Sequence, residues 1–407
     1  MTDADGDADI PAAVPALAIL GAAPRFKDAL HVGRPNLGDR AALMRRFGDI
    51  LDRRWFTNDG PMVREFEQKV AAVAGTRHAV AVCNATIGLE ILFRAANLTG
   101  EVIVPSFTFV ATAHALQWQE IEPVFCDVRE DTHAIDPAVV ESLVTPRTTG
   151  IVGVHMWGRG CDVEALADVA RRRKLRLFFD AAHAFACSHG GRSIGGFGDA
   201  EVFSFHATKF CSSFEGGAIV TDDDALAEKA RLMRNFGFAG KDRVIHVGSN
   251  GKMTEVCAAM GITSIEALDG LIAENRVRWE RYRERLARIP GVTLASAPRG
   301  ERWNHQYVIA DVDASRTGLP RDALLKALEA ENVLARRYFF PGVHRMEPYA
   351  SSPRYRDVSL PATERLCDRV LALPTGGAVS LGEVDGVCDT IAAAVARAPE
   401  VLRRLSP

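Results

Sequence analysis

Between residues 78 and 223, short apolar runs alternate with amphipathic helical patterns, and this alternation limits the folds open to the chain. The apolar runs are rich in Val, Ile and Phe, which is typical of strands buried on both faces. Strands that are connected through helices lie parallel, with helices covering both faces of the sheet. The sequence therefore predicts a mainly parallel sheet built from strands at 78–83, 101–106, 122–128, 149–158, 175–183, 200–206 and 216–223.

The pattern changes near residue 255. A helical pattern begins at Thr254 and ends before Pro290-Gly291, which predicts one long helix. Shorter strands and two further helical patterns follow it and indicate a smaller α/β unit. We therefore expect a loose N-terminal arm over 1–30, where Asp, Ala and Pro dominate, a large domain over 31–255, and a connecting helix with a small C-terminal domain over 256–407.

Charge and cysteine usage exclude several classes of protein. The formal net charge of −3 argues against a nucleic-acid-binding or membrane-surface protein. The chain has no run of about twenty apolar residues, and its first residues are acidic where a secretory signal is basic, so we expect a cytoplasmic protein with no membrane span. The eight cysteines are scattered singly without a CxxC pair, which predicts buried thiols and no metal site.

The residues that carry chemistry lie between Phe178 and Thr221. Asp180 ends an apolar strand, at the edge where α/β sheets bind ligands, and His183 follows it. Lys209 lies between FSFHAT and FCSSFEGG, with aromatic residues on both sides. Desolvation disfavours an ammonium and lowers the pKa of a lysine in such a setting. A neutral lysine amine can attack a carbonyl, so Lys209 is a candidate Schiff-base lysine.

Three features near this lysine favour pyridoxal phosphate over a plain surface lysine. Asp180 can hold the proton on a pyridine nitrogen. Ser204 and Thr208 supply hydroxyls for a phosphate. The turn Asn84-Ala85-Thr86 leads from a strand into a helix, where backbone N–H groups form a phosphate cradle.

Segments along most of the chain carry a resemblance to one family. They are RRWFTNDGPMVREFE (53–67), AVCNATIGLEI (81–91), VPSFTFVATAHA (104–115), FDAAHAFA (179–186), GDAEVFSFHATK (198–209), EGGAIVT (215–221), GSNGKM (248–253) and RRYFFPGVH (336–344). Over roughly residues 31–390 the chain resembles the DegT/StrS family of nucleotide-sugar aminotransferases. This resemblance implies the aspartate-aminotransferase-like fold (fold type I), an α/β fold with a mainly parallel mixed sheet and a smaller C-terminal α/β domain, and pyridoxal phosphate as cofactor.

The resemblance also implies roles for single residues. Lys209 would bind the cofactor and act as acid and base, Asp180 would pair with the pyridine nitrogen, and His183 would lie near the ring hydroxyl. Phe109 and His183 have a competing interpretation as core residues, and Asn250 has one as a turn residue. The other implied cofactor contacts are Phe109 on the ring face, Ala85, Thr86 and Ser204 at the phosphate, and Asn250 reaching the phosphate of the partner subunit in a homodimer with shared sites.

Some relatives have histidine at the lysine position and deoxygenate the sugar, so Lys209 favours transamination. The best interpretation is transfer from L-glutamate to C4 of dTDP-4-keto-6-deoxy-D-glucose in deoxysugar biosynthesis of secondary metabolism, including antibiotics. The basic candidates for the sugar-nucleotide pyrophosphate are Arg234, Lys241, Arg243 and Lys252.

Three alternatives stay open. The first is amination at C3 of the 3-keto isomer, and the second is a non-catalytic homologue that keeps the cofactor fold as a regulator. The third is a different fold-type I reaction, by a dehydratase, a decarboxylase or a cysteine desulfurase. A desulfurase needs a mobile nucleophilic cysteine, for which Cys211 is the nearby candidate.

Overall fold

The computed structural model describes residues 15–406 and contains a seven-stranded sheet in the order β2-β10-β9-β6-β5-β3-β4. Its strands from β9 to β4 in this order are parallel, whereas β10 runs antiparallel to both β9 and β2. No helix separates β9 from β10, so the chain reverses direction there. The predicted mainly parallel mixed sheet is confirmed, with strands β2 (His78–Val82), β3 (Glu101–Pro105), β4 (Glu122–Cys126), β5 (Thr148–Val154), β6 (Arg176–Asp180), β9 (Ala200–Ser204) and β10 (Gly217–Thr221).

Helices cover both faces of this sheet, because successive strand residues point to opposite sides. In β2, Val80 and Val82 pack with helices α3, α4 and α7, whereas Ala79 and Ala81 belong to the cluster that includes α2, α6 and α8. The helices of this larger unit are α1 (Arg40–Arg53), α2 (Pro61–Ala74), α3 (Ala85–Ala95), α4 (Ala111–Gln117), α5 (Pro137–Ser142), α6 (Val163–Arg173), α7 (Asp224–Met233) and α8 (Glu255–Glu266).

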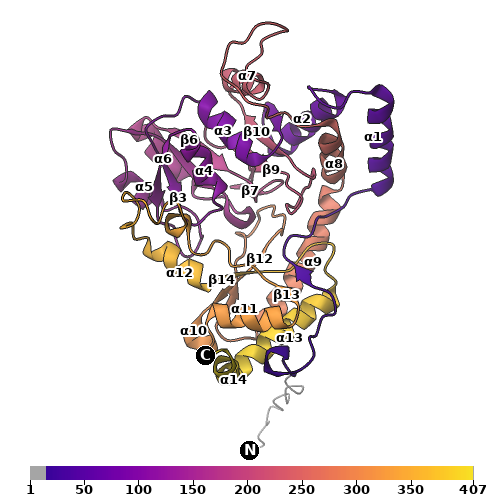
Figure 1. The fold of residues 1–407 in the computed structure, drawn as a ribbon, viewed down its shortest axis with the longest axis vertical. Helices are drawn as coiled ribbons and strands as arrows, with labels where there is room; N and C mark the ends of the chain where they lie inside the picture. Colours follow the sequence, from indigo (N-terminus) through magenta and orange to yellow (C-terminus); the bar gives the residue numbers. More distant parts are fainter. Residues whose placement is uncertain (1–14, 407) are drawn as a thin grey trace, which may run out of the picture.

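A smaller unit lies below the large sheet (Figure 1). Its three strands are antiparallel, in the order β11 (Val292–Leu294), β12 (Val308–Val312), β14 (Val370–Leu373). Its helices are α9 (Leu268–Leu286), α10 (Ala314–Thr317), α11 (Arg321–Ala330), α12 (Pro361–Arg369), α13 (Leu381–Ala396) and α14 (Ala398–Leu405). The short elements are β7 (Ser188–His189), β8 (Arg192–Ser193), and the 3₁₀ turns η2 (Met156–Gly158) and η3 (Val343–Arg345).

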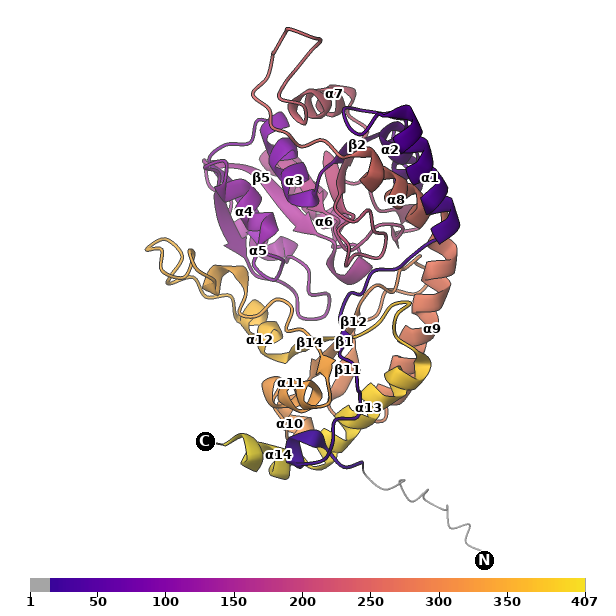
Figure 2. The same ribbon diagram turned by 45° about the vertical axis from the view of Figure 1, so that its right-hand side comes forward.

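The prediction of one long helix after residue 254 is wrong. The segment forms α8 and α9, which meet at Ala267 with a bend of 64°. The two halves have different packing partners, since α8 packs against α2 and α1 while α9 packs against α13 of the smaller unit (Figure 2). Within residues 15–406 no single helix is long and apolar enough to cross a membrane, although α8 and α9 together reach that length and composition across their bend.

The prediction of a loose arm is wrong for residues 15–30, and residues 1–14 lie outside the described part of the chain. Leu17 is buried beside the 3₁₀ turn η1 (Ala18–Leu20), and β1 (Leu30–His31) pairs in parallel with β13 (Val333–Leu334). The buried carboxylate of Glu331 accepts hydrogen bonds from the backbone N–H groups of Ala18 at 2.7 Å and Arg25 at 2.6 Å. A buried carboxylate needs such donors. The Glu331 carboxylate thereby holds residues 15–30 on the smaller unit.

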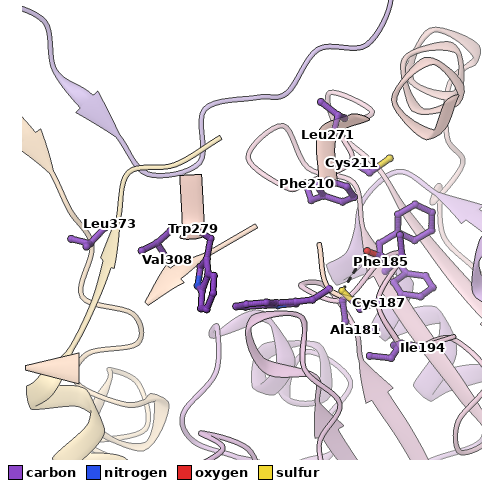
Figure 3. Close-up of a cluster of buried hydrophobic side chains, with 14 of the residues drawn as sticks. Ala181, Phe185, Cys187, Ile194, Phe210, Cys211, Leu271, Trp279, Val308 and Leu373 are labelled. Carbon is purple, nitrogen blue, oxygen red and sulfur yellow. Dashed lines mark hydrogen bonds between the residues drawn. The ribbon is translucent and has the colours of Figure 1, made fainter. Parts of the chain in front are cut away.

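One hydrophobic cluster joins the two units. Trp279 of α9 and Val308 of β12 belong to the same cluster as Phe185 and Phe210 of the larger unit (Figure 3). This shared core holds the beginning of β12 against the segment that follows β6. The smaller unit is thereby positioned to contribute side chains at the carboxyl ends of the large sheet's strands.

Candidate active site

A cavity of about 660 Å³ opens at the carboxyl ends of β5, β6 and β9. This is the edge at which parallel α/β sheets bind ligands. Its wall includes residues of the larger unit and a group from the smaller unit, Tyr307, Arg336, Tyr338 and Phe339. The structure brings these sequence-predicted residues together in the wall: Ala85, Thr86, Phe109, Asp180, His183, Ser204 and Lys209.

Lys209 lies in the loop that connects β9 to β10. Its Nζ donates a hydrogen bond to the hydroxyl of Tyr307 at 3.3 Å. Burial lowers the pKa of Lys209 to about 8, and the negative charge of Asp180 offsets only part of that effect. The amine therefore exchanges its proton near neutral pH, the condition that both nucleophilic and acid–base work require.

Asp180 is the last residue of β6, and only 7% of it is exposed. Its Oδ2 accepts a hydrogen bond from the Thr112 hydroxyl at 2.8 Å, and its Oδ1 accepts one from the Ala182 N–H at 3.1 Å. Both carboxylate oxygens are thus oriented by neutral donors while the group lines the cavity. A carboxylate in this setting suits a positively charged ring nitrogen.

His183 stacks on Trp157, with ring centroids 5.4 Å apart and an interplanar angle of 16°. Burial lowers the pKa of His183 well below its usual value, and the charge of Lys209 acts in the same direction. Its imidazole is therefore neutral. Its ring lines the cavity, and within residues 15–406 its buried Nδ1 has no hydrogen-bond partner.

The first turn of α3 forms one end of the cavity. Asn84 has extended backbone angles, and its side chain accepts a hydrogen bond from the Ile87 N–H at 2.9 Å, which begins the helix. Ala85 and Thr86 then present the helix N-terminus to the cavity, where backbone N–H groups favour a phosphate. A Cβ at Gly217 would lie 2.7 Å from the Ala85 nitrogen, so only glycine lets β10 approach this turn.

Phe109 completes a site that fits pyridoxal phosphate. Its side chain lines the cavity and is 59% exposed, which is unusual for a phenylalanine and leaves an aromatic face uncovered. The cavity thus combines a helix N-terminus for a phosphate, an aromatic face for a ring, a carboxylate for a ring nitrogen, and a lysine of lowered pKa. Each of these groups suits one part of the cofactor.

Sequence reasoning assigned no role to Tyr307, Arg336 and Tyr338. The segment RRYFFPGVH contributes only to the family resemblance, and Tyr307 lies in a part of the chain for which the sequence predicts only short strands and helices. Within residues 15–406, Arg336 takes part in no ion pair, whereas the neighbouring Arg337 pairs with Asp322 at 3.2 Å. Arg336 is therefore a cation at the cavity wall without a carboxylate partner among these residues, and it interacts with the neighbouring Tyr338.

Three other candidate residues lie outside this cavity. Asn250 is exposed and accepts a hydrogen bond from Lys252 Nζ at 2.6 Å, so its contact with a partner's cofactor stays a prediction. Arg234 is buried and paired with Glu67 and Asp59, which removes it from the free cations that could meet a pyrophosphate. Cys211 is buried and burial raises its pKa, which argues against a mobile desulfurase nucleophile.

Comparison with known proteins agrees with this geometry. The model of the DegT/DnrJ/EryC1/StrS aminotransferase family matches residues 39–392. A dTDP-4-amino-4,6-dideoxy-D-glucose transaminase from Shigella dysenteriae is 34% identical over 89% of this chain and 98% of its own length. The spore coat polysaccharide biosynthesis protein SpsC from Bacillus subtilis is 33% identical over 84% of this chain and 92% of its own length.

Solved structures show the same relationship. DesI, determined in the presence of its TDP-sugar product, superposes with a TM-score of 0.91 and 50% identity over 95% of this chain and 98% of its own. The aminotransferase TlmJ from Streptoalloteichus hindustanus superposes with a TM-score of 0.84 and 29% identity over 91% of this chain and 100% of its own. The chain is a pyridoxal-phosphate-dependent sugar aminotransferase with the fold of these neighbours, and it belongs to the DegT/DnrJ/EryC1/StrS aminotransferase family.

Proposed function

We propose that the chain transfers an amino group from L-glutamate to C4 of dTDP-4-keto-6-deoxy-D-glucose, giving dTDP-4-amino-4,6-dideoxyglucose for deoxysugar biosynthesis. The observation that carries the reaction type is the cavity whose wall combines Lys209, with its lowered pKa, Asp180, and Arg336, which forms no ion pair within residues 15–406. The names of the Shigella dysenteriae and Escherichia coli relatives, at 34% and 32% identity, support the C4 product. Amination at C3 of the 3-keto isomer is the second candidate.

In this proposal the cavity holds pyridoxal phosphate through groups at the carboxyl ends of the large sheet's strands. The N-terminus of α3 at Ala85 and Thr86 and the Ser204 hydroxyl bind the phosphate. Phe109 covers one ring face and Asp180 holds the proton on the ring nitrogen. When bound, the cofactor supplies an electron sink that makes the proton on the carbon beside the transferred amine removable.

Lys209 would remove that proton from carbon as a neutral amine, hold it as an ammonium, and return it to carbon. Its pKa of about 8 lets the same amine accept a proton in one half of the reaction and donate it in the other. The amine donates a hydrogen bond to the Tyr307 hydroxyl at 3.3 Å, which favours positions of Nζ at that wall of the cavity. His183, neutral and stacked on Trp157, lines the cavity and lies near the ring hydroxyl in this proposal.

Arg336 is the group that we propose for the carboxylate of the amino donor. Every amino-acid donor carries an α-carboxylate, and a guanidinium binds a carboxylate through two parallel hydrogen bonds. Arg336 lines the cavity from the smaller unit, on the same wall as Tyr338. An amino acid bound there would place its amine toward Lys209.

We further propose that the active form is a cytoplasmic homodimer whose sites are shared. Asn250 lies outside the cavity of its own chain and so is available to a partner. The segment that contains it projects beyond α7 (Figures 1 and 2) and exposes apolar side chains that favour association, including Phe236, Val244 and Val247. The cysteines within residues 15–406 are all free thiols, which suits a reducing compartment.

The deciding experiment is to incubate the protein with dTDP-4-keto-6-deoxy-D-glucose, L-glutamate and pyridoxal phosphate, and to identify the product by mass spectrometry and NMR. A 4-amino-4,6-dideoxy sugar supports the proposal, and Lys209→Ala should abolish its formation. A product only from the 3-keto isomer would move the assignment to C3. If product formed with another amino donor but not with L-glutamate, only the assignment of L-glutamate as the donor would be overturned.

A further inference from the structure

The hydroxyl of Thr112 is used differently from those of the buried threonines inside α8 and α13, and in the same way as that of Thr363 in the first turn of α12, which donates to Asp127 at 2.8 Å. A helical threonine usually donates its hydroxyl proton to the carbonyl oxygen four residues earlier. Thr263 in α8 does so at 2.8 Å, and Thr390 in α13 does so at 3.0 Å. Thr112, in the first turn of α4, instead donates to Asp180 Oδ2, 68 residues further along the chain, at 2.8 Å. Its hydroxyl therefore connects two elements rather than closing its own helix.

A second hydroxyl lies behind the first. The Oγ1 atoms of Thr108 and Thr112 are 3.0 Å apart. A hydroxyl has one proton, and that of Thr112 is donated to Asp180, so Thr108 must be the donor in this pair. The hydrogen bonds therefore run from Thr108 through Thr112 to Asp180. All three residues are buried, with exposed fractions of 1%, 0% and 7%.

Apart from the Thr112 hydroxyl, the Asp180 carboxylate is held by one backbone N–H group within residues 15–406. Among residues 15–406, Asp180 Oδ1 accepts from the Ala182 N–H, which belongs to the turn after β6, and Oδ2 accepts only from Thr112. Two donors from different elements define the plane of a carboxylate, whereas one donor leaves it free to rotate. Hydrogen bonds to an ionised group are also about twice as strong as neutral ones.

We propose that Thr112, supported by Thr108, is a positioning residue that sets both the orientation of the Asp180 carboxylate and its strength as a proton acceptor toward the ring nitrogen of the bound cofactor. This inference rests on the proposed pairing of Asp180 with that nitrogen. A carboxylate that loses a donor competes more strongly for a nearby proton. Removing the Thr112 hydroxyl therefore draws the shared proton away from the ring.

The same turn also carries Phe109. The Thr112 N–H donates to the Phe109 carbonyl oxygen at 3.2 Å. The first turn of α4 thus connects the aromatic face proposed for the ring with the acid proposed for its nitrogen. Movement of the turn would disturb both contacts at once, so loss of the hydroxyl should weaken cofactor binding as well as shift the proton.

The test uses holoenzyme reconstituted with cofactor labelled with ¹⁵N in the ring, without substrates. In Thr112→Val, we expect the nitrogen signal to move toward that of unprotonated pyridine and the cofactor dissociation constant to rise about ten-fold. Thr112→Ser restores the hydroxyl and should return both values to those of the wild type. Thr390→Val, which removes an ordinary helical back-bond, is the matched control and should change neither.

Two further variants test the hydrogen bond from Thr108 and the pairing of Asp180 with the ring nitrogen separately. Thr108→Val leaves Thr112 in place and should shift the nitrogen signal in the same direction by a smaller amount, so it decides the question if Thr112→Val does not fold. Asp180→Asn tests the pairing itself. If Asp180→Asn moves the signal while Thr112→Val and Thr108→Val do not, the role of Thr112 is refuted and the proposed function stands. A signal unchanged in Asp180→Asn overturns the pairing and this inference together.

Discussion

Lys209 illustrates how burial and charge compete at a single residue. Burial favours the neutral amine and the charge of Asp180 favours the ammonium, and the pKa of about 8, against an ordinary 10.5, shows that burial prevails. Because only the neutral amine is a nucleophile, its reactivity should rise with pH and level off just above pH 8. Competitive acetylation of the cofactor-free protein, read by mass spectrometry, measures this curve. A lysine peptide in the same tube is the reference, and its reactivity should keep rising toward pH 10.5. If the curve of Lys209 coincided with that of the peptide, the pKa of Lys209 would not be lowered.

Arg336 and Arg337 are adjacent cations with different surroundings, which makes them a matched pair. Arg337 is already paired with Asp322, and Arg336 faces the cavity without a carboxylate partner within residues 15–406. Arg336→Gln should raise KM for L-glutamate by about ten-fold or more while changing kcat little, since a charge-assisted contact contributes about 1.5–3 kcal/mol to binding. Arg337→Gln should leave KM unchanged. A rise in KM for the sugar nucleotide instead would assign Arg336 to the other substrate.

Between elements, the contact of β10 with the N-terminus of α3 depends on Gly217. A Cβ there would lie 2.7 Å from the Ala85 nitrogen and 2.8 Å from the Asn84 carbonyl carbon, both backbone atoms that move only with the helix. Gly217→Ala should therefore weaken cofactor binding by about ten-fold, since one kcal/mol or more of strain falls on the phosphate cradle. Gly270→Ala in α9, where nothing lies within 4 Å, is the control. It should raise stability by about 0.5–1 kcal/mol in thermal unfolding and leave cofactor affinity unchanged.

The bend between α8 and α9 could not be predicted from hydrophobic periodicity. The apolar positions continue at helical spacing through Ala267, so the sequence predicts one helix there. In the structure α8 is buried on the larger unit and α9 crosses to the smaller one, and the 64° bend between them follows from those separate partners. Periodicity reports which face of a helix is buried, but not against which neighbour.

For the whole molecule, the proposed shared sites make a prediction about mixtures of inactive variants. Lys209→Ala lacks the catalytic amine and Asn250→Ala lacks the contact predicted for the partner's cofactor. If Asn250 acts across the interface, a hybrid dimer retains one intact site, and an equal mixture refolded together should recover about a quarter of wild-type activity by random pairing. If Asn250 acts within its own chain, no hybrid site is intact. Product formation by the mixture, against each variant refolded alone, separates the two cases.

Features that depend on neighbours along the chain could be predicted from the amino-acid sequence. Alternating apolar runs and helical patterns were sufficient to predict the mainly parallel sheet, because strand and helix periods are local properties. The positions of Asp180 at a strand end, of Lys209 in an apolar loop, and of Ala85 at a helix start follow from the same local rules. These three residues do line one cavity.

The distant side chains that meet in this cavity could not be predicted, because their contacts form only when the chain folds. Tyr307 reaches Lys209 from 98 residues away, and Thr112 reaches Asp180 across 68. Arg336 reaches the cavity wall from the smaller unit, and the predicted loose segment before residue 30 packs on that unit through Glu331. No local pattern encodes such contacts, because they depend on how the two units pack around their shared core and on which buried polar group then needs a partner.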